Sequence, residues 1–370
     1  MTAKTVAQTL AQKIIARAAG REAVGRGEIV TARVDLAMIH DSGGPRRVAP
    51  ILERLGVGLW DASRVVLIVD HYVPAEDEES RRIVGQAQAF AARHALGGFY
   101  DGEGICHVVL PERGHLRPGL FAVGGDSHSP TGGAYQAVEY AGEAIGALPM
   151  QERMTLSNMT AELGGQTGLI APDAVTVDYL RAAGADPSDW RQWFSDPDAP
   201  LLAHHRFAAE ELQPQVAAPH SPALSAAVGE YQGRPIDVAY IGACTGAKLV
   251  DLRMAAEVLR GQRVAEGVSL FVAPASRRDQ EAAAADGTLQ VLLDAGGRLL
   301  PNACGICAGY GGARLGEDVT CISTTARNFR GRMGAASSQV FLASPYTVAA
   351  SALGGRITDP RPHLTGRAGA

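Results

Sequence analysis

Apolar positions along the chain follow two patterns that occur in turn. Short runs rich in β-branched residues predict strands, and longer stretches with apolar residues every three to four positions predict amphipathic helices. Strands are expected at residues 29–39, 64–70, 119–124, 237–241, 267–273 and 319–323. Helices are expected at residues 47–55, 77–95, 133–147, 249–260 and 277–285. Strands that alternate with helices in this way predict an α/β fold.

The N-terminal segment combines helical periodicity with a basic composition. Its first 21 residues hold four basic side chains and no acidic one, as a cleaved targeting segment also does. Val6, Leu10, Ile14 and Ile15 lie at helical spacing, however, and this favours a helix docked on the rest of the protein.

Breaks in the composition predict three α/β domains, at residues 1–132, 133–227 and 228–370. The clearest break is the segment 213–227, which is rich in Pro, Ala and Ser and is typical of a linker. A weaker break lies at Gly132 and Gly133.

The overall composition is typical of a globular protein. Hydrophobic residues make up 46% and charged residues 20% of the 370 positions, and the net charge is −5. The arginines form no run dense enough to follow a phosphate backbone, and no apolar stretch approaches the about 18 residues needed to cross a bilayer. We therefore expect neither a nucleic-acid nor a membrane partner.

The five cysteines carry the first chemical signal. Their odd number, in a chain without a secretion signal, favours a reducing compartment, with the cytoplasm as the default. Cys304 and Cys307 form a C-x-x-C pair, and Cys244 stands alone in the motif IGACTG. Three thiolates without a fourth indicate a [4Fe–4S] cluster with one open iron, because electron-transfer clusters take four. From the cysteines alone, a zinc site, a redox pair and buried thiols stay open. Cys106 and Cys321, flanked by apolar residues, are expected in the core.

Several chemically active side chains directly follow predicted strands, and sites in α/β folds gather at the carboxyl ends of strands. These side chains are Asp70, His71, Asp126, Ser127, His128, Cys244 and Arg327. Asp126, Ser127 and His128 taken alone suggest a hydrolase triad. Neighbours along an extended chain point to opposite faces, however, which makes that geometry poor.

A set of motifs, in a fixed order, resembles the motifs of one enzyme family. They are DLAMIHD (35–41), DHYVP (70–74), GDSH (125–128), the segment 165–173, IGACT (241–245), CGIC (304–307), STTARNFRGR (323–332) and LASPYTVAAS (342–351). Their order is similar to that of the aconitase superfamily. The length of the chain most resembles the large subunits of 3-isopropylmalate dehydratases, and the similarity covers nearly the whole chain.

This resemblance implies aconitase-like three-layer α/β/α domains around a [4Fe–4S] cluster. Cys244, Cys304 and Cys307 would be its three protein ligands, which leaves one iron open for the substrate. The swivel domain of single-chain aconitases is expected to be absent, because little of the chain follows Arg332. A separate small swivel-domain subunit, in a heterodimer or heterotetramer, would then complete the site.

The resemblance also implies three pairs of a histidine with a carboxylate, which would fix the tautomer and raise the pKa of each ring. The pairs are Asp70 with His71, His107 with Asp126, and His128 with Glu162. Of these, His71 would protonate the departing hydroxyl of the substrate. Taken singly, a histidine after a strand is more often an ordinary loop residue.

The same resemblance implies four residues that bind the substrate: Ser127, Asn158, Arg327 and Arg332. Guanidinium groups bind carboxylates bidentately, as a dicarboxylate or tricarboxylate substrate requires. Outside this set of motifs, the two arginines would be typical of the surface.

The chain departs from the family pattern at three places. Gly246 follows the Cys-Thr pair and Ala326 precedes Arg327, where the family usually has asparagines that would lie near the cluster. These changes put in doubt that the substrate is 3-isopropylmalate. The segment 129–131 is more similar to the aconitase version than to the usual large-subunit sequence.

The leading hypothesis is a large subunit of a [4Fe–4S] hydro-lyase. It would isomerise a small hydroxy di- or tricarboxylic acid, similar to 3-isopropylmalate, by dehydration and rehydration. The alternative is a related hydro-lyase for an acid of the aconitate, homoaconitate, citramalate or dimethylmalate type. Rival hypotheses of other classes are a non-catalytic iron or redox sensor and a zinc or redox protein that uses only the cysteines. The three histidine–carboxylate pairs argue against the sensor.

Overall fold

The computed structural model describes residues 6–129, 137–310 and 314–364, in two compact units. Unit 1 comprises Met1–Leu67, Phe90–Phe99 and Val109–Glu211, and unit 2 comprises Ile68–Ala89, Tyr100–Val108 and Leu212–Ala370. The chain therefore passes between the units several times. The three-domain division stays a prediction, and its weaker break at Gly132 and Gly133 lies outside the described residues.

Unit 2 is built on a seven-stranded sheet with the order β11-β10-β9-β12-β13-β7-β8. The strands from β11 to β13 run parallel, whereas β7 and β8 pair in antiparallel fashion at one edge. Their bounds are Gln215–Ala217 (β7), Ser225–Ala227 (β8), Val238–Ile241 (β9), Ser269–Val272 (β10), Arg298–Leu299 (β11), Thr320–Ser323 (β12) and Gln339–Ala343 (β13).

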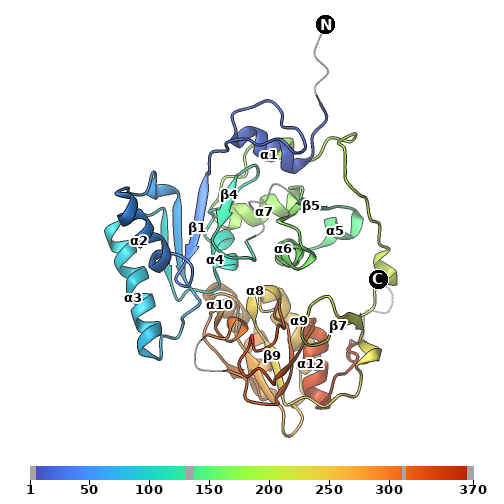
Figure 1. Ribbon diagram of the computed structural model, residues 1–370. Helices are drawn as coiled ribbons and strands as arrows, with labels where there is room; N and C mark the ends of the chain where they lie inside the picture. The colour runs from blue at the N-terminus through green and yellow to red at the C-terminus, as the bar shows by residue number, and fades with distance from the viewer. Residues whose placement is uncertain (1–5, 130–136, 311–313, 365–370) are drawn as a thin grey trace. The chain divides into compact units, whose positions relative to one another are not determined.

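Two hydrophobic cores cover the two faces of this sheet. Successive side chains of a strand point to opposite faces, so Ala239 and Ile241 of β9 enter one core and Val238 and Tyr240 enter the other. Helices α9 and α12 pack on each other, and α12 also packs on β9 (Figure 1). The helices of this part of the chain are Ala243–Gly246 (α8), Leu249–Leu259 (α9), Arg277–Ala285 (α10), Thr288–Asp294 (α11) and Pro345–Gly354 (α12).

The other two sheets are smaller. A four-stranded sheet has the order β3-β2-β1-β4, with β1 and β4 parallel, and β5 and β6 form a parallel pair. The bounds are Leu36–His40 (β1), Val65–Val69 (β2), Gly98–Asp101 (β3), Ala122–Gly124 (β4), Ala137–Tyr140 (β5) and Thr167–Ile170 (β6). The division between the units falls within β2 and β3.

The remaining helices precede the seven-stranded sheet in the sequence (Figure 1). They are Leu10–Ala18 (α1), Pro45–Leu55 (α2), Glu78–Arg93 (α3), Cys106–Glu112 (α4), Glu143–Ala147 (α5), Met150–Met159 (α6) and Ala174–Ala182 (α7). Short 3₁₀ turns occur at Ala62–Arg64, Thr160–Leu163 (η2), Trp190–Gln192, Ala209–Glu211, Val228–Glu230, Gly305–Ala308 (η6) and Arg361–His363.

Predicted elements with strong local signals are confirmed. Helix α10 has the predicted bounds, because the Ser276 side chain accepts a hydrogen bond from the Asp279 backbone and so caps its start. The N-terminal helix is present as α1, where Thr9 and Gln12 form a capping box. Five of the six predicted strands differ from the observed ones by no more than a few residues at their ends.

Three sequence predictions are wrong. Of the strand at 29–39 only β1 forms, and Ile29 is exposed rather than packed. Residues 137–147 hold β5 and then α5 instead of one helix, with Gly142 at a φ of 111° between them, and residues 133–136 lie outside the described part. The segment 213–227 is not a linker, because its β7 pairs with β13 and its β8 pairs with β7, which completes the large sheet.

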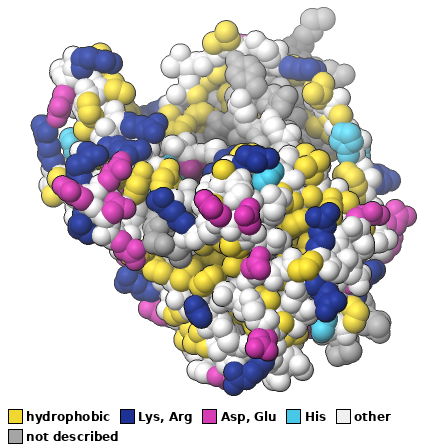
Figure 2. Space-filling view, turned by 60° about the horizontal axis from the view of Figure 1, so that its bottom comes forward, with side chains coloured by type: hydrophobic (Ala, Val, Ile, Leu, Met, Phe, Trp, Pro, Cys, Tyr) yellow, Lys and Arg dark blue, Asp and Glu magenta, His cyan; other side chains and the backbone are white. Residues whose placement is uncertain are grey.

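On the face shown in Figure 2, acidic and basic side chains are interspersed, without a continuous basic area. Among the described residues, no helix is both long and apolar enough to cross a membrane.

Candidate functional site

Cys244 lies just after the central strand β9 of unit 2, in a tightly bonded loop. The Thr324 hydroxyl accepts a hydrogen bond from the Gly242 N–H at 2.9 Å and donates one to the Gly242 carbonyl at 2.8 Å. The Thr245 hydroxyl in turn donates to the Thr324 carbonyl at 2.8 Å. Ala243 adopts a left-handed φ of 71°, which is costly for a residue with a side chain. These contacts fix Cys244 against the end of β12.

The close contact with Thr324 explains one departure from the family pattern. A Cβ atom added at Gly246 would lie 2.2 Å from the Thr324 Cβ and 2.5 Å from its hydroxyl oxygen. Because Thr324 fills this space, an asparagine at position 246 does not fit. The second departure, Ala326, is fully buried.

Cys304 and Cys307 lie on the single turn η6. The Cys307 N–H donates to the Cys304 carbonyl at 3.0 Å, and Gly309, at a φ of 74°, ends the turn. A Cβ atom at Gly309 would lie 2.5 Å from the Arg332 carbonyl oxygen, so glycine lets this turn approach the arginine segment. Residues 311–313, which follow soon after this turn, lie outside the described residues.

None of the five cysteines is in a disulfide, and they lie in two kinds of environment. The hydrogen bond with Cys307 and then burial raise the pKa of Cys304 well above its usual range, and Asp70 and Cys244 add to this effect. The structure therefore brings the three predicted ligands together. Cys106 and Cys321 are fully buried, which confirms them as core thiols.

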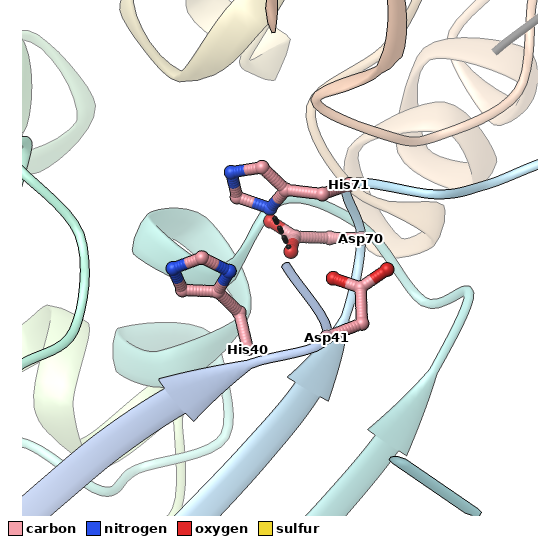
Figure 3. Close-up of side chains that lie close together, drawn as sticks. All are labelled: His40, Asp41, Asp70 and His71. Carbon is pink, nitrogen blue, oxygen red and sulfur yellow. Dashed lines mark hydrogen bonds and ion pairs between the residues drawn. The ribbon is translucent and has the colours of Figure 1, made fainter. Parts of the chain in front are cut away.

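Asp70 forms hydrogen bonds both with His71, the candidate acid, and with the turn that carries Cys304 and Cys307. Its Oδ1 accepts a hydrogen bond from His71 Nδ1 at 2.7 Å (Figure 3). Its Oδ2 accepts one from the Cys106 N–H at 2.8 Å. Its backbone carbonyl accepts a third from the Cys304 N–H at 2.8 Å. The carboxylate is completely buried. A proton on Nδ1 leaves Nε2 as the ring nitrogen that can exchange a proton with a substrate.

The two predicted arginines lie on the segment after β12. Arg327 and Arg332 are partly buried, whereas Arg330 is exposed. The Arg327 guanidinium lies 5.6 Å from the centre of the Phe329 ring. Partial burial distinguishes these two arginines from the exposed Arg330.

In unit 1, a second histidine is held by two acidic residues. His128 Nε2 lies 2.9 Å from Glu162 Oε1, so the expected pair forms. The His128 N–H also donates to Asp126 Oδ1 at 2.8 Å, and its Nδ1 lies 3.6 Å from the same oxygen. The expected pair of His107 with Asp126 joins residues of different units and stays a prediction.

The remaining predicted site residues differ in their burial and position. Ser127 is exposed in the loop after β4, and Asn158 is buried near the end of α6, one turn before Glu162. His107, in unit 2, is the second residue of α4 and is partly buried.

Sequence reasoning assigned no role to His40, although it lies beside Asp126. Its Nε2 is 3.2 Å from the Gly125 carbonyl and 4.0 Å from Asp126 Oδ2, and its Nδ1 accepts from the Gly43 N–H at 3.3 Å. His40 ends β1, as Figure 3 shows, and this position at the end of a parallel strand was the available signal.

Comparison with known proteins decides the family. The aconitase family (aconitate hydratase) matches residues 12–137 and 131–355. The chain belongs to the aconitase family. This membership confirms the resemblance and the aconitase-like α/β fold, makes the chain a hydro-lyase, and implies a [4Fe–4S] cluster.

Curated relatives agree over almost the full length of the chain. The 3-isopropylmalate dehydratase large subunit 1 of Methanopyrus kandleri is 38% identical over 96% of this chain and all of its own. The probable 3-isopropylmalate dehydratase large subunit of Methanothermobacter thermautotrophicus is 35% identical over 96% of this chain and 99% of its own. The probable methanogen homoaconitase large subunit of Methanosarcina mazei is 37% identical over 89% of this chain and 99% of its own.

Proposed function

We propose that this chain is the catalytic large subunit of a hydro-lyase that isomerises a hydroxy di- or tricarboxylic acid by dehydration and rehydration. The observation that carries the proposal is the position of Asp70. Its carboxylate holds the candidate acid His71, and its backbone carbonyl holds the Cys304 turn. Asp70 alone therefore positions both the candidate proton donor, His71, and a candidate metal ligand, Cys304.

The donor atoms of unit 2 fit the iron–sulfur cluster that the family implies. Cys244, Cys304 and Cys307 supply three thiols from two loops, none of them in a disulfide. Thiolates are the ligands that such clusters take, and three of them leave one iron without a protein ligand. We assign these three cysteines as the cluster ligands. When bound, the cluster supplies a Lewis acid that polarises the hydroxyl group to be removed.

The side chains of the protein would supply the proton transfer and the positioning. His71 would protonate the departing hydroxide from Nε2, while Asp70 holds Nδ1 and stabilises the charged ring. Arg327 and Arg332 would bind the carboxylates of the substrate bidentately. His107, Asp126, His128 and Glu162 would complete the acid–base groups, and Ser127 and Asn158 would bind the substrate.

The substrate class follows from these groups and from the relatives. A hydroxy acid with at least two carboxylates matches two partly buried guanidinium groups. The relatives are named for 3-isopropylmalate dehydratase and for homoaconitase, which supports an acid similar to 3-isopropylmalate or, as the alternative, a homoaconitate-type acid. Gly246, in the loop of Cys244, and Ala326, beside Arg327, would alter the surroundings of the cluster and still put 3-isopropylmalate itself in doubt.

We further propose a separate small subunit with a swivel domain, in a heterodimer or heterotetramer. The relatives are named as large subunits, which implies a small partner for those proteins. The cytoplasm is the proposed location, because five cysteines outside disulfides suit a reducing compartment.

Anaerobic reconstitution with iron and sulfide tests the proposal. We expect about four irons per chain, broad visible absorbance, and, with a candidate small subunit, loss or gain of the ultraviolet absorbance of the unsaturated acid. Cys244→Ser, Cys304→Ser and Cys307→Ser should each lose iron and activity, whereas Cys321→Ala should keep both. Full iron content without turnover on any di- or tricarboxylic acid would support the sensor instead.

A further inference from the structure

Tyr240 carries a buried hydroxyl that the protein itself does not satisfy. Its side chain is 1% exposed, in the centre of the seven-stranded sheet. Within the described residues, its hydroxyl has no hydrogen-bond partner. Leaving such a group unpaired costs about 1–3 kcal/mol, so a native protein rarely buries one without a use.

The Tyr240 hydroxyl lies at the cysteine loops. A Cβ atom added at Gly242 would lie 2.2 Å from the Tyr240 Cζ and 2.3 Å from its hydroxyl oxygen, so the end of the ring rests on the loop that leads to Cys244. Tyr240 also shares a hydrophobic core with Ile306, which lies between Cys304 and Cys307. Packing against both cysteine loops therefore fixes the position of the hydroxyl.

The hydroxyl is a permanent donor in this environment. Burial and then the nearby thiols of Cys307, Cys304, Cys321 and Cys244 raise the pKa of Tyr240 well above its usual range. A protonated phenol can give its hydrogen to an electron-rich acceptor such as a sulfide or thiolate sulfur. Gly246 and Ala326, which replace two family asparagines, have no side-chain donor to offer there.

We propose that the Tyr240 hydroxyl donates a hydrogen bond to a sulfur atom of the [4Fe–4S] cluster and thereby raises its reduction potential. This inference rests on the cluster assignment under the proposed function. Hydrogen bonds to cluster sulfurs stabilise the more negative, reduced state and are one of the factors that set the potential. Tyr240 is thus a positioning residue, which acts through the cluster and not on the substrate.

The Tyr240→Phe variant of the reconstituted full chain tests this role, because it removes the hydroxyl and keeps the ring. We expect unchanged iron content and a lower midpoint potential, measured by redox titration with electron paramagnetic resonance. One net hydrogen bond corresponds to about a fivefold change in the ratio of reduced to oxidised cluster, or about 40 mV. Tyr231→Phe is the matched control, because the Tyr231 hydroxyl already donates to the Leu224 carbonyl in the same unit.

Two further measurements separate hydrogen bonding from packing. Without the cluster, Tyr240→Phe should be at least as stable as the wild type towards urea, because it removes an unpaired group. Tyr240→4-aminophenylalanine, which restores an N–H donor, should recover most of the potential.

Two results would overturn the inference. One is an unchanged potential in Tyr240→Phe, and the other is a loss of stability in this variant without the cluster, which would mean that the hydroxyl has a partner in the protein. A wild-type chain that assembles no cluster would instead overturn the proposed function.

Discussion

The two units hold their histidine–carboxylate pairs by different means. In unit 2, Asp70 and His71 are adjacent in sequence, and the backbone of Cys106 and of Cys304 bonds to Asp70. In unit 1, His128 and Glu162 are 34 residues apart and meet through side-chain atoms, with Asp126 as a further acceptor. Backbone bonds fix a carboxylate more firmly than a contact between two side chains. The pair of unit 2 should therefore be the more sensitive one.

Asp70→Asn should give the largest loss of activity. The amide can still accept from the Cys106 N–H, but it cannot hold His71 in the charged form or in the same tautomer. We expect kcat to fall about 10²- to 10⁴-fold, the usual contribution of a general acid. Iron content should stay at the wild-type level, because the bond to Cys304 uses the Asp70 backbone. A kcat close to that of the wild type would contradict the claim that the Asp70–His71 pair is the more sensitive of the two.

Lys248→Met should give the largest loss of stability in unit 2. Lys248 is fully buried, and its Nζ lies 2.8 Å from Asp251 Oδ2 and donates to the Cys244 carbonyl at 3.0 Å. Removing one partner of such a buried pair costs about 3 kcal/mol. Urea unfolding of the chain without the cluster measures this loss. Arg253→Met, which breaks a more exposed ion pair of the same helix, should cost less than about 1 kcal/mol, and equal losses would contradict this reasoning.

Glu162→Gln should lower kcat less than Asp70→Asn does. The glutamine can still accept from His128 Nε2, and Asp126 still holds the His128 backbone. We expect a loss of about 10- to 100-fold, typical of a weakened outer hydrogen bond to a working histidine. Parallel steady-state kinetics of the two variants decide the comparison. If Glu162→Gln proves the more severe, unit 1 holds the dominant acid–base group.

Asp173→Asn tests unit 1 by stability alone, and its effect should be smaller than that of Lys248→Met. Asp173 Oδ1 and Oδ2 bind the buried Arg153 guanidinium at 2.8 and 2.7 Å. The hydrogen bond from Arg153 lowers the pKa of Asp173, against the opposing effect of burial. Because the carboxylate is 40% exposed, we expect a loss of only about 1–2 kcal/mol at neutral pH.

The pH dependence of this last effect has a definite sign. A carboxyl group whose pKa is lowered by folding stabilises the protein above its unfolded pKa, and this contribution disappears as the pH falls through the folded pKa. The difference in Tm between the wild type and Asp173→Asn should therefore be constant above about pH 5 and shrink below the usual pKa of 3.8. A difference that grows on acidification would refute the ion pair as its cause.

Much of the fold was predictable because its signals are local. The cap of α10 at Ser276 and the capping box of α1 lie within a few residues of the helices that they begin. The segment 213–227 has no such signal, since β7 joins the sheet only by pairing with β13, more than a hundred residues further on, and β8 pairs with β7. Composition alone therefore made this segment resemble a linker.

The candidate site likewise has features that the sequence predicted and features that it could not predict. The C-x-x-C pair and the Asp70–His71 pair are visible in sequence, because their members are neighbours along the chain. The bond from Cys304 to Asp70 and the bonds between Thr324 and Gly242 cross long stretches of chain and have no sequence pattern. The unpaired hydroxyl of Tyr240 was likewise not predictable, because burial of a single atom depends on every element around it.

The sequence by itself determined the family, the α/β class and the residue types of the site, because these depend on short motifs and on local periodicity. Only the tertiary structure decided which groups hold one another. It placed Asp70 between the acid and the cysteine turn, filled the space beside Gly246 with Thr324, and left Tyr240 without a partner among the described residues. The physical reason is that hydrogen bonds and close packing act over a few ångströms of space, whatever the separation along the chain.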